Sequence, residues 1–326
     1  MPLPPSHIDS IKGYIEIARV DHWFKQVFCL PGIAMAIALD GAPVTSQSVV
    51  KMLIGLLAVC ITCSSNYVIN EVIDGPFDRF HPDKQHRPIP SGRVKVKWAY
   101  IEWLLLGAGG ISLGWMVNPA FFVTNASIWV MGIIYNVPPI RAKDVAVADV
   151  LTESVNNPIR LLMGWYAAGA ARIAPLSLLC AYWSLGAFLM TAKRYAEYRR
   201  IGDKQAASEY RRSFRWYNDT RLMALMVFYV SSFSLLLGIF LVKYRVELVL
   251  TVPFVAAVIT IYWHISLRRN SPVQAPEKLY RERRLMIACF AVAIVGTALL
   301  FIDLPWLGQF FEVHPPALAK LVGPRV

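Results

Sequence analysis

The sequence predicts an all-α, polytopic membrane protein with nine transmembrane helices around a central cavity. Of its 326 residues, 56% are hydrophobic and 17% are charged, and the mean hydropathy is +0.46. Soluble domains carry about 25% charged residues. Apolar runs of about 20 residues, the length that crosses a bilayer core of roughly 30 Å, recur almost to the C-terminus. This composition excludes a disordered, collagen-like, coiled-coil or disulfide-stapled secreted protein.

Nine apolar segments are expected to be helical, and loops rich in Lys and Arg follow every second one. The segments lie at about 23–41, 49–72, 98–117, 120–136, 146–168, 174–194, 222–242, 246–266 and 285–303. Asn118-Pro119 separates the third from the fourth. The fifth is interrupted by Asn156, Asn157, Pro158 and Arg160. We expect one membrane-embedded domain over residues 1–326, with an interfacial N-terminus at 1–22 and a C-terminal tail at 304–326.

Basic residues gather in alternate connections. The N-terminal segment and loops 73–97, 137–145, 193–221 and 267–284 hold 26 of the 33 Lys and Arg residues. By the positive-inside rule these segments lie in the cytoplasm, with the N-terminus inside and the C-terminus outside. Topology therefore explains most of the net charge of +12. We expect a multi-pass protein of the bacterial inner (plasma) membrane with no nucleic-acid partner, since no separate basic module exists.

The loop that follows the second segment carries a candidate metal site. Asn70, Asp74 and Asp78 are spaced by four residues, which on a helix would place them in one stripe at the membrane surface. Gly75-Pro76 would disturb that helix, in which case Asp78 curls back from a loop. Either arrangement brings carboxylates together at the mouth of the bundle.

Carboxylates in this position suit a complex of Mg²⁺ with a diphosphate. Mg²⁺ prefers oxygen ligands and typically takes one or two protein carboxylates together with substrate phosphates. Lys84 and Arg87 follow closely and could contact those phosphates. The alternative is a solvated acidic loop that caps a helix. In the first case, Mg²⁺ is the expected cofactor, bound as a complex with the diphosphate of the substrate.

The second basic loop and one buried charge add candidates for phosphate binding. Lys193 and Arg194 stand beside Tyr195 and Glu197, and cations in direct contact with phosphate oxygens suit a substrate with an additional phosphate. The positive-inside rule would explain the number of basic residues there, but it would not explain why so few acidic residues accompany them. Arg160 lies within a span, where a charge is costly and is usually paired or functional. It would hold a phosphate, neutralise the Asp cluster or tie the fifth helix to a neighbour.

Several of these motifs resemble a known family. The pattern from Asn70 to Asp78, followed by Lys84-x-x-Arg87-Pro88, resembles the first signature of the UbiA superfamily of membrane prenyltransferases. Asp78 to Lys84 and Lys193 to Glu197 are similar to the decaprenyl-phosphate phosphoribosyltransferase branch. The segment from Arg19 to Gln26, which includes Lys25, is also similar to that branch. The segment from Tyr135 to Arg141 looks more like the general superfamily.

The resemblance implies a fold, a reaction and roles for individual residues. The reaction is Mg²⁺-dependent transfer of 5-phosphoribose from phosphoribosyl diphosphate to a polyprenyl phosphate such as decaprenyl phosphate. Diphosphate is released, and the product feeds cell-envelope arabinose or ribose glycans. The metal is held by Asp74, Asp78 and Asn70. Tyr195 and Glu197 orient ribose hydroxyls as catalytic residues, and the implied substrate contacts are Asn70, Glu71, Lys84, Arg87, Arg160, Lys193, Arg194 and Lys25.

Two alternatives remain open. One is a prenyltransferase of the same family that moves an isoprenoid from its diphosphate to an aromatic or other acceptor. The other, from a different class, is a transporter for an anionic solute, which would need neither Mg²⁺ nor diphosphate release. The basic second loop favours phosphoribosyl transfer. The sequence also leaves room for a homo-oligomer.

Overall fold

The computed structural model describes residues 11–79, 84–274 and 276–311, and every regular element in that part of the chain is a helix. The α-helices are α1 (Ile11–Ile17), α2 (Leu30–Asp40), α3 (Ser46–Asp78), α4 (Val96–Trp115), α5 (Pro119–Asn136), α6 (Ala148–Ser154), α7 (Asn156–Ala167), α8 (Leu176–Ile201), α9 (Lys204–Tyr210), α10 (Asp219–Tyr244), α11 (Val252–Ser266), α12 (Arg283–Phe301) and α13 (Pro305–Phe311). Short 3₁₀ helices connect them: η1 (Val20–Cys29), η2 (Ala142–Asp144), η3 (Arg212–Arg215), η4 (Val246–Thr251), η5 (Pro272–Gln274) and η6 (Pro276–Arg281). The predicted all-α fold is confirmed.

Six helical segments of the described chain are long and apolar enough to cross a membrane on their own. They are Ile11–Asp40, Ser46–Asp78, Leu176–Ile201, Asp219–Tyr244, Val246–Ser266 and Arg283–Phe301. The remaining predicted spans coincide with α4, α5 and the pair α6–α7, which are shorter or less apolar. The count of nine transmembrane helices therefore stays a prediction.

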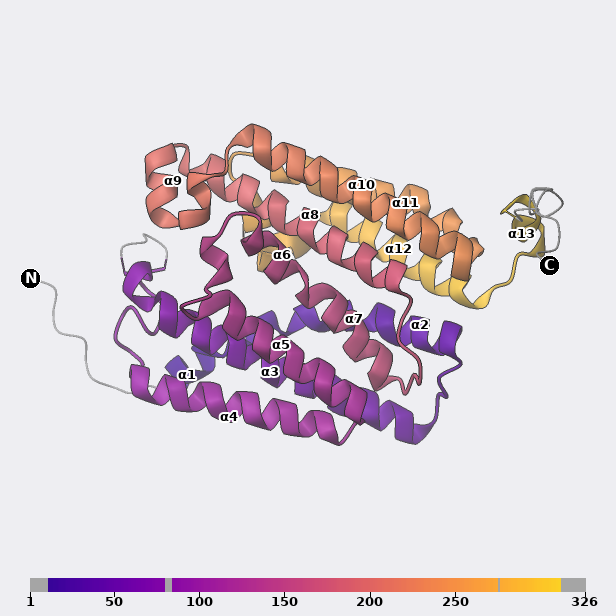
Figure 1. Ribbon diagram of the computed structural model, residues 1–326, viewed down its shortest axis with the longest axis horizontal. Helices are drawn as coiled ribbons and strands as arrows, with labels where there is room; N and C mark the ends of the chain where they lie inside the picture. The colour runs from indigo at the N-terminus through magenta and orange to yellow at the C-terminus, as the bar shows by residue number, and fades with distance from the viewer. Residues whose placement is uncertain (1–10, 80–83, 275, 312–326) are drawn as a thin grey trace, which may run out of the picture.

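The helices form two groups with a broken helix between them. Helices α3, α4 and α5 pack side by side, as do α8 and α10, and α11 packs against α12 (Figure 1). Helices α6 and α7 contact both α5 and α8, while α7 also packs on α2 and α3. The polar residues of α6 and α7 thus lie at the centre of the bundle.

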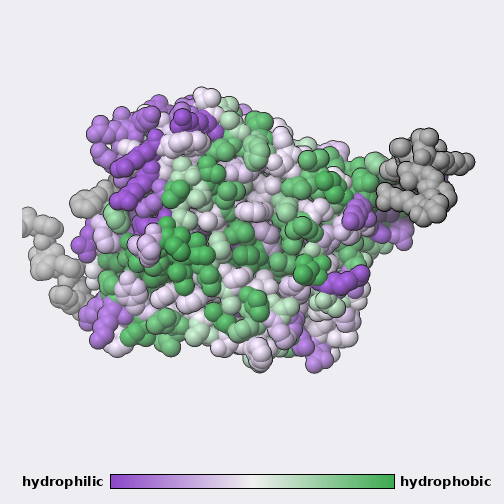
Figure 2. Space-filling view, in the orientation of Figure 1, coloured by the Kyte–Doolittle hydropathy of each residue, from purple (hydrophilic) through white to green (hydrophobic). Residues whose placement is uncertain are grey.

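The outer surface has the chemistry of a membrane protein. Large apolar side chains such as Phe228 and Leu235 on α10, and Ile287 and Phe290 on α12, are exposed. Figure 2 shows apolar residues over the flank and hydrophilic residues gathered at the end that carries α9. Lipid is the solvent that such a flank requires, because contiguous apolar surface of this extent is rare on soluble monomers.

Two helix ends differ from the sequence prediction. Helix α3 continues through Gly75 and Pro76 to Asp78, so the first residues of the expected loop 73–97, up to Asp78, are helical. Helix α8 extends to Ile201, and Lys193 to Glu197 are therefore helical rather than in a loop, which corrects the predicted start of loop 193–221. The helix ends there because Gly202 adopts φ = 73°, a conformation that glycine tolerates best.

The predicted fifth span, 146–168, is not one helix. It begins only after Val147, which has φ = 67°, and it breaks at Val155 into α6 and α7. Pro158 explains the break, because it cannot donate the amide hydrogen that would join its turn to the preceding one. The break places the start of α7, and with it Arg160, inside the bundle.

Two glycines allow α7 to approach the start of the first span. A Cβ atom on Gly164 would lie 1.9 Å from the carbonyl oxygen of Cys29, and one on Gly32 would lie 2.0 Å from the carbonyl oxygen of Leu161. Backbone atoms cannot move aside as a flexible side chain does. The crossing of α7 with η1 and α2 therefore requires glycine at both positions.

We expect Gly164→Ala to destabilise the protein by at least about 2 kcal/mol, as overpacking of a backbone contact does. Gly109→Ala is the matched control, because a Cβ atom on Gly109 meets nothing within 4 Å. Alanine is the better helix former, so the control should be neutral or more stable by up to about 1 kcal/mol. Thermal unfolding in detergent measures both. Equal unfolding temperatures for the two variants would contradict the close crossing.

Candidate active site

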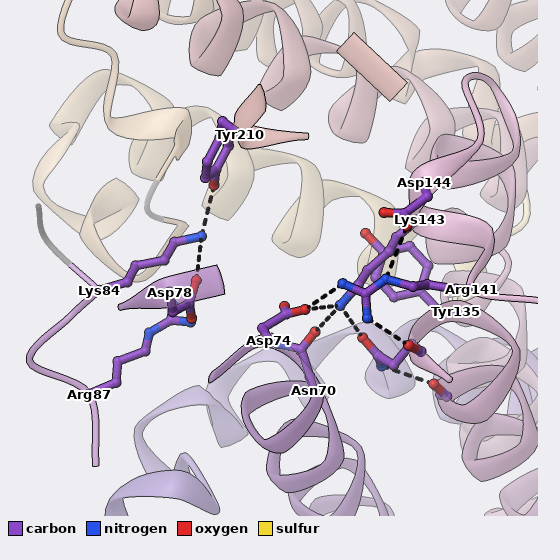
Figure 3. A network of polar contacts seen from close by, with 12 residues as sticks. Asn70, Asp74, Asp78, Lys84, Arg87, Tyr135, Arg141, Lys143, Asp144 and Tyr210 are labelled. Atoms are coloured by element: carbon purple, nitrogen blue, oxygen red, sulfur yellow. Dashed lines mark hydrogen bonds and ion pairs between the residues drawn. The ribbon is translucent and has the colours of Figure 1, made fainter. Parts of the chain in front are cut away.

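The three residues of the expected metal stripe lie on successive turns of one continuous helix. Asn70, Asp74 and Asp78 belong to α3, and Figure 3 shows that each interacts with basic residues from other segments. The first of the two arrangements left open by the sequence is therefore the one observed. The stripe faces the connection between α5 and α6 on one side and the segment after residue 84 on the other.

The ammonium group of Lys143 is enclosed by three side-chain oxygens. Its Nζ donates hydrogen bonds to Asp74 Oδ1 at 2.6 Å, to Asn136 Oδ1 at 3.1 Å and to Asn70 Oδ1 at 3.3 Å. Arg141 Nη2 also donates to Asp74 Oδ1, at 3.0 Å. Lys143, within η2, and Arg141, directly before it, therefore neutralise Asp74. We call Asn70, Asp74, Asn136, Arg141 and Lys143 the Asp74 group.

Burial strongly affects the titration of Lys143, which is only 3% exposed. Burial lowers its pKa to about 8, the positive charges of Arg141 and Arg211 contribute, and the negative charge of Asp74 opposes the change. The Lys143 charge therefore depends on the Asp74 carboxylate. An anion that binds near Arg141 and Lys143 would compete for the same cations.

Asp78 has its own pair of cations. Its carboxylate accepts a hydrogen bond from Arg87 Nη1 at 2.6 Å, and Lys84 Nζ lies 3.8 Å away. Lys84 also donates a hydrogen bond to Tyr210 Oη at 2.8 Å, which joins this segment to the end of α9 (Figure 3). Asp78, Lys84, Arg87 and Tyr210 are called the Asp78 group below.

Glu71 has a different environment from its neighbours on α3. It is 1% exposed, accepts a hydrogen bond from the backbone amide of Ile89 at 3.3 Å, and lies 3.7 Å from Arg19. These contacts attach the segment around Ile89 and the end of α1 to α3. The structure thus gives Glu71 a role in holding these segments together.

The α3 stripe fits a magnesium ion only when substrate supplies further ligands. Asn70, Asp74 and Asp78 offer the hard oxygen donors that Mg²⁺ prefers. Within residues 11–79, 84–274 and 276–311, no cluster of three or more His, Cys, Asp or Glu side chains could hold a metal by itself. Both carboxylates are paired with cations. The donor set therefore suits Mg²⁺ that arrives with phosphate oxygens, which can also accept hydrogen bonds from those cations.

A second buried group surrounds Arg194 on α8. Its Nε donates to Asp149 Oδ2 at 2.9 Å, its Nη1 to Glu197 Oε2 at 2.7 Å, and its Nη2 to Tyr135 Oη at 3.1 Å. Arg194 is 2% exposed. Its guanidinium is fully engaged in joining α5, α6 and α8, which makes it a positioning residue for Glu197. We call Tyr135, Asp149, Arg194 and Glu197 the Arg194 group.

Asp149 is the centre of the Arg194 group and is completely buried. Besides Arg194, it accepts hydrogen bonds from Tyr217 Oη at 2.6 Å and from Ser213 Oγ at 3.2 Å. Burial and the adjacent carboxylate raise the pKa of Tyr217, so its phenol stays protonated and donates. Asp149 therefore anchors the segment around η3 to α6.

Lys193 and Tyr195 have opposite surroundings although they lie close together on α8. Among the described residues, Lys193 makes no hydrogen bond or ion pair, and it is partly exposed inside the bundle. Tyr195 packs in the hydrophobic core beside Phe188 and accepts a hydrogen bond from Arg199 Nη1 at 3.3 Å. Lys193 is thus available to a ligand, whereas Tyr195 has core contacts.

Arg160 and Lys25 lie deeper in the bundle. Arg160 Nε donates to Gln26 Oε1 at 3.2 Å, and its Nη2 lies 3.9 Å from Cys63 Sγ. Lys25 Nζ is 3.2 Å from His22 Nδ1 and sits over the ring of Tyr67. Within the part of the chain that the structure describes, Arg160 has no carboxylate within ion-pair distance. A charge within the bundle is costly unless it is paired or functional, so Arg160 stays a candidate for anion binding.

Sequence reasoning missed several residues of these groups. Asn136, Arg141 and Lys143 follow Tyr135, and only the likeness of this segment to the general superfamily pointed to them. Asp149 was included in a predicted apolar span, where an acidic residue was itself a signal of function or pairing. Their contacts with α3 and α8 depend on the packing of distant segments.

The fold and these groups together define a class of protein: an integral membrane protein whose helical bundle carries buried groups of charged side chains. Residues 27–290 match the model of the UbiA prenyltransferase family, so the chain belongs to this family. The family consists of enzymes, and the chain is therefore a UbiA-type transferase.

Individual relatives agree with this assignment. The chain is 26% identical over 314 residues to a decaprenyl-phosphate phosphoribosyltransferase of Mycobacterium tuberculosis, covering 91% of this chain and 97% of the relative. It is 28% identical over 227 residues to the protein of that name from Mycolicibacterium smegmatis, covering 67% and 66%. A UbiA homolog from Archaeoglobus fulgidus, solved with DMAPP and Mg²⁺, has a TM-score of 0.66 at 19% identity, covering 89% and 99%.

Proposed function

We propose that the chain transfers 5-phosphoribose from phosphoribosyl diphosphate to a polyprenyl phosphate, such as decaprenyl phosphate, and releases diphosphate. The observation that carries this proposal is the positive charge around Lys193 and the Arg194 group. Asp149 and Glu197 are already paired with Arg194, while Lys193 makes no hydrogen bond or ion pair with a described residue and feels the charges of Glu197 and Glu153 only at longer range. A half-site with cations in excess suits a donor that carries a phosphate besides its diphosphate. The names of the mycobacterial relatives support the same donor.

The Asp74 and Asp78 groups would bind the metal and the diphosphate, and Lys193, beside the Arg194 group, would bind the additional phosphate. Asp74, Asp78 and Asn70 would hold Mg²⁺, which as a Lewis acid neutralises charge on the departing diphosphate. Arg141, Lys143, Lys84 and Arg87 would donate hydrogen bonds to diphosphate oxygens in exchange for their carboxylate partners. Lys193 would contact the additional phosphate.

The chemistry needs no strong base. An oxygen of the lipid phosphate forms a bond to C1 of the ribose as the bond from C1 to the diphosphate oxygen breaks, and the electron pair leaves with the diphosphate. The attacking phosphate is already an anion, so the protein has to position it rather than deprotonate it. Arg160 and Lys25, which lie deeper in the bundle, are placed to hold that anion. Glu197, held by Arg194, would accept hydrogen bonds from ribose hydroxyls.

The orientation in the membrane belongs to the same proposal. The end of the bundle that carries α9 is hydrophilic (Figure 2), and the Asp78 group is attached to α9 through the hydrogen bond between Lys84 and Tyr210. We place this end in the cytoplasm of a bacterial inner membrane, where a water-soluble sugar diphosphate is available, and propose that the product feeds envelope glycans.

A donor comparison tests the proposal against prenyl transfer. Purified protein receives Mg²⁺ and either labelled phosphoribosyl diphosphate with polyprenyl phosphate, or a labelled isoprenoid diphosphate with an aromatic acceptor. We expect label from the sugar donor in the lipid fraction and no adduct from the isoprenoid donor. Label that stays in the aqueous phase, with formation of a prenylated acceptor, would replace our proposal with the second activity. Neither product would contradict both.

A further inference from the structure

Arg211 lies in the chain between a contact to the Asp78 group and a contact to the Arg194 group. It follows Tyr210, the last residue of α9, and precedes Arg212, the first residue of η3. Tyr210 accepts a hydrogen bond from Lys84 of the Asp78 group, and Ser213 donates one to Asp149 of the Arg194 group. The chain is thus attached on both sides of Arg211, which fixes the position of its backbone.

The guanidinium of Arg211 has donors without acceptors. It lies 3.5 Å from Asp149 through Nη1, its one ion pair with a described residue, and it donates no side-chain hydrogen bond within residues 11–79, 84–274 and 276–311. The Nη1 atom is buried, whereas the side chain as a whole is 19% exposed. Buried donors without acceptors are unfavourable, and a guanidinium offers five N–H groups in a fixed fork. An acceptor with several oxygens is missing from this place.

The charge of Arg211 acts on the Asp74 group and on the residues around the Arg194 group. It acts on Asp74 and Lys143 on one side and on Lys193 and Glu197 on the other. Asp74 is already paired with Lys143, and Asp149 and Glu197 are already paired with Arg194, so the charge of Arg211 is in excess over these three carboxylates. The missing acceptor is therefore an anion. A phosphoryl group supplies several oxygens and the charge that an arginine fork binds best.

We propose that Arg211 binds a phosphoryl group of the substrate between the Asp74 group and the Arg194 group. The substrate class rests on the proposed function, since both the sugar donor and the acceptor lipid carry phosphate. The chemistry shared by both is a phosphoryl group with free oxygens. The ion pair with Asp149 would hold the guanidinium in place. Arg212 and Arg215 of the same segment are exposed.

Binding measurements on the purified full-length protein in detergent test this role. The probes are inorganic diphosphate with Mg²⁺ and a polyprenyl phosphate in mixed micelles, each titrated by calorimetry. We expect Arg211→Gln to weaken binding of at least one probe by about 10- to 100-fold, as loss of a charge-assisted hydrogen-bonding pair does. Arg211→Lys keeps the charge but loses the fork, and it should bind with intermediate affinity. Arg212→Gln removes the same charge next door and should stay within about twofold of wild type.

The pattern across the two probes identifies the source of the phosphoryl group. Weaker binding of diphosphate alone assigns Arg211 to the soluble donor, and weaker binding of the lipid alone assigns it to the acceptor. Arg211→Gln leaves Asp149 with Arg194, Ser213 and Tyr217 as partners, so we expect the variant to fold. Arg211→Lys serves the same test if it does not.

The outcomes separate this inference from the proposed function. Binding of both probes by Arg211→Gln with wild-type affinity would overturn the inference, and so would a wild-type protein that binds neither probe. A wild-type protein that makes no phosphoribosyl lipid, but whose phosphate binding depends on Arg211, would contradict the proposed reaction and support the role of Arg211.

Discussion

Asp74→Asn is expected to lower kcat/KM for transfer by about 1000-fold, equivalent to about 4 kcal/mol of transition-state stabilisation, because it removes a carboxylate proposed to hold Mg²⁺. The asparagine keeps the size of the side chain and one oxygen acceptor. Lys143 retains its hydrogen bonds to Asn70 and Asn136, and Arg141 retains Asp144 at 3.1 Å. The variant should therefore fold. Steady-state kinetics at several Mg²⁺ concentrations measure the loss.

Asp144→Asn is the matched control for this experiment. Asp144 shares Arg141 with Asp74 but does not lie on the α3 stripe (Figure 3). The same change of charge at this position should alter kcat/KM by less than about threefold, as for an exposed ion pair. Equal losses in the two variants would show that Asp74 acts only through Arg141, and activity retained in Asp74→Asn would refute the metal assignment.

Asp149→Asn is expected to destabilise the fold by about 3–5 kcal/mol, since it leaves the buried Arg194 charge with one carboxylate where it had two. The cost follows from burial, because Asp149 is fully inaccessible and Arg194 is 2% exposed. Asp219→Asn, on the exposed first turn of α10, should change stability by less than about 0.5 kcal/mol. Thermal and chemical unfolding in detergent compare the two.

A double-mutant cycle separates the ion pair from other effects of this change. With Arg194→Met in place, the further change Asp149→Asn should cost much less than it does in the wild-type background, because no buried guanidinium remains to lose its partner. Additive losses in the two single variants would show that the pair does not stabilise the protein as the geometry implies.

Much of the fold followed from the sequence because hydrophobic length is a local property. The apolar segments matched helices, and the fourfold spacing of Asn70, Asp74 and Asp78 gave the stripe on α3. The end of α8 was predicted too early, because the charges of Lys193 and Arg194 looked like a loop. These charges are tolerated in a helix because Asp149 and Glu197 pair with Arg194.

The candidate site was harder to derive, because partners are set by tertiary packing. Nothing local to Lys143 indicates that its ammonium reaches α3, and nothing local distinguishes Arg211 from the exposed Arg212. Conversely, Tyr195 looked functional beside Lys193 but points into the core. Sequence patterns thus indicated the segments around the ends of α3 and α8 as candidates, whereas the contacts of their basic residues depend on the packing of α3, α6 and α8.

The central claim is that one protein couples diphosphate release to formation of a phosphoribosyl lipid. The most direct measurement follows both products in one reaction with purified protein, Mg²⁺, phosphoribosyl diphosphate and polyprenyl phosphate. We predict equal amounts of released diphosphate and of lipid that has gained one phosphoribose by mass spectrometry, with neither product when Mg²⁺ is chelated. Diphosphate released without a phosphoribosyl lipid, or no consumption of the sugar donor, would contradict the account.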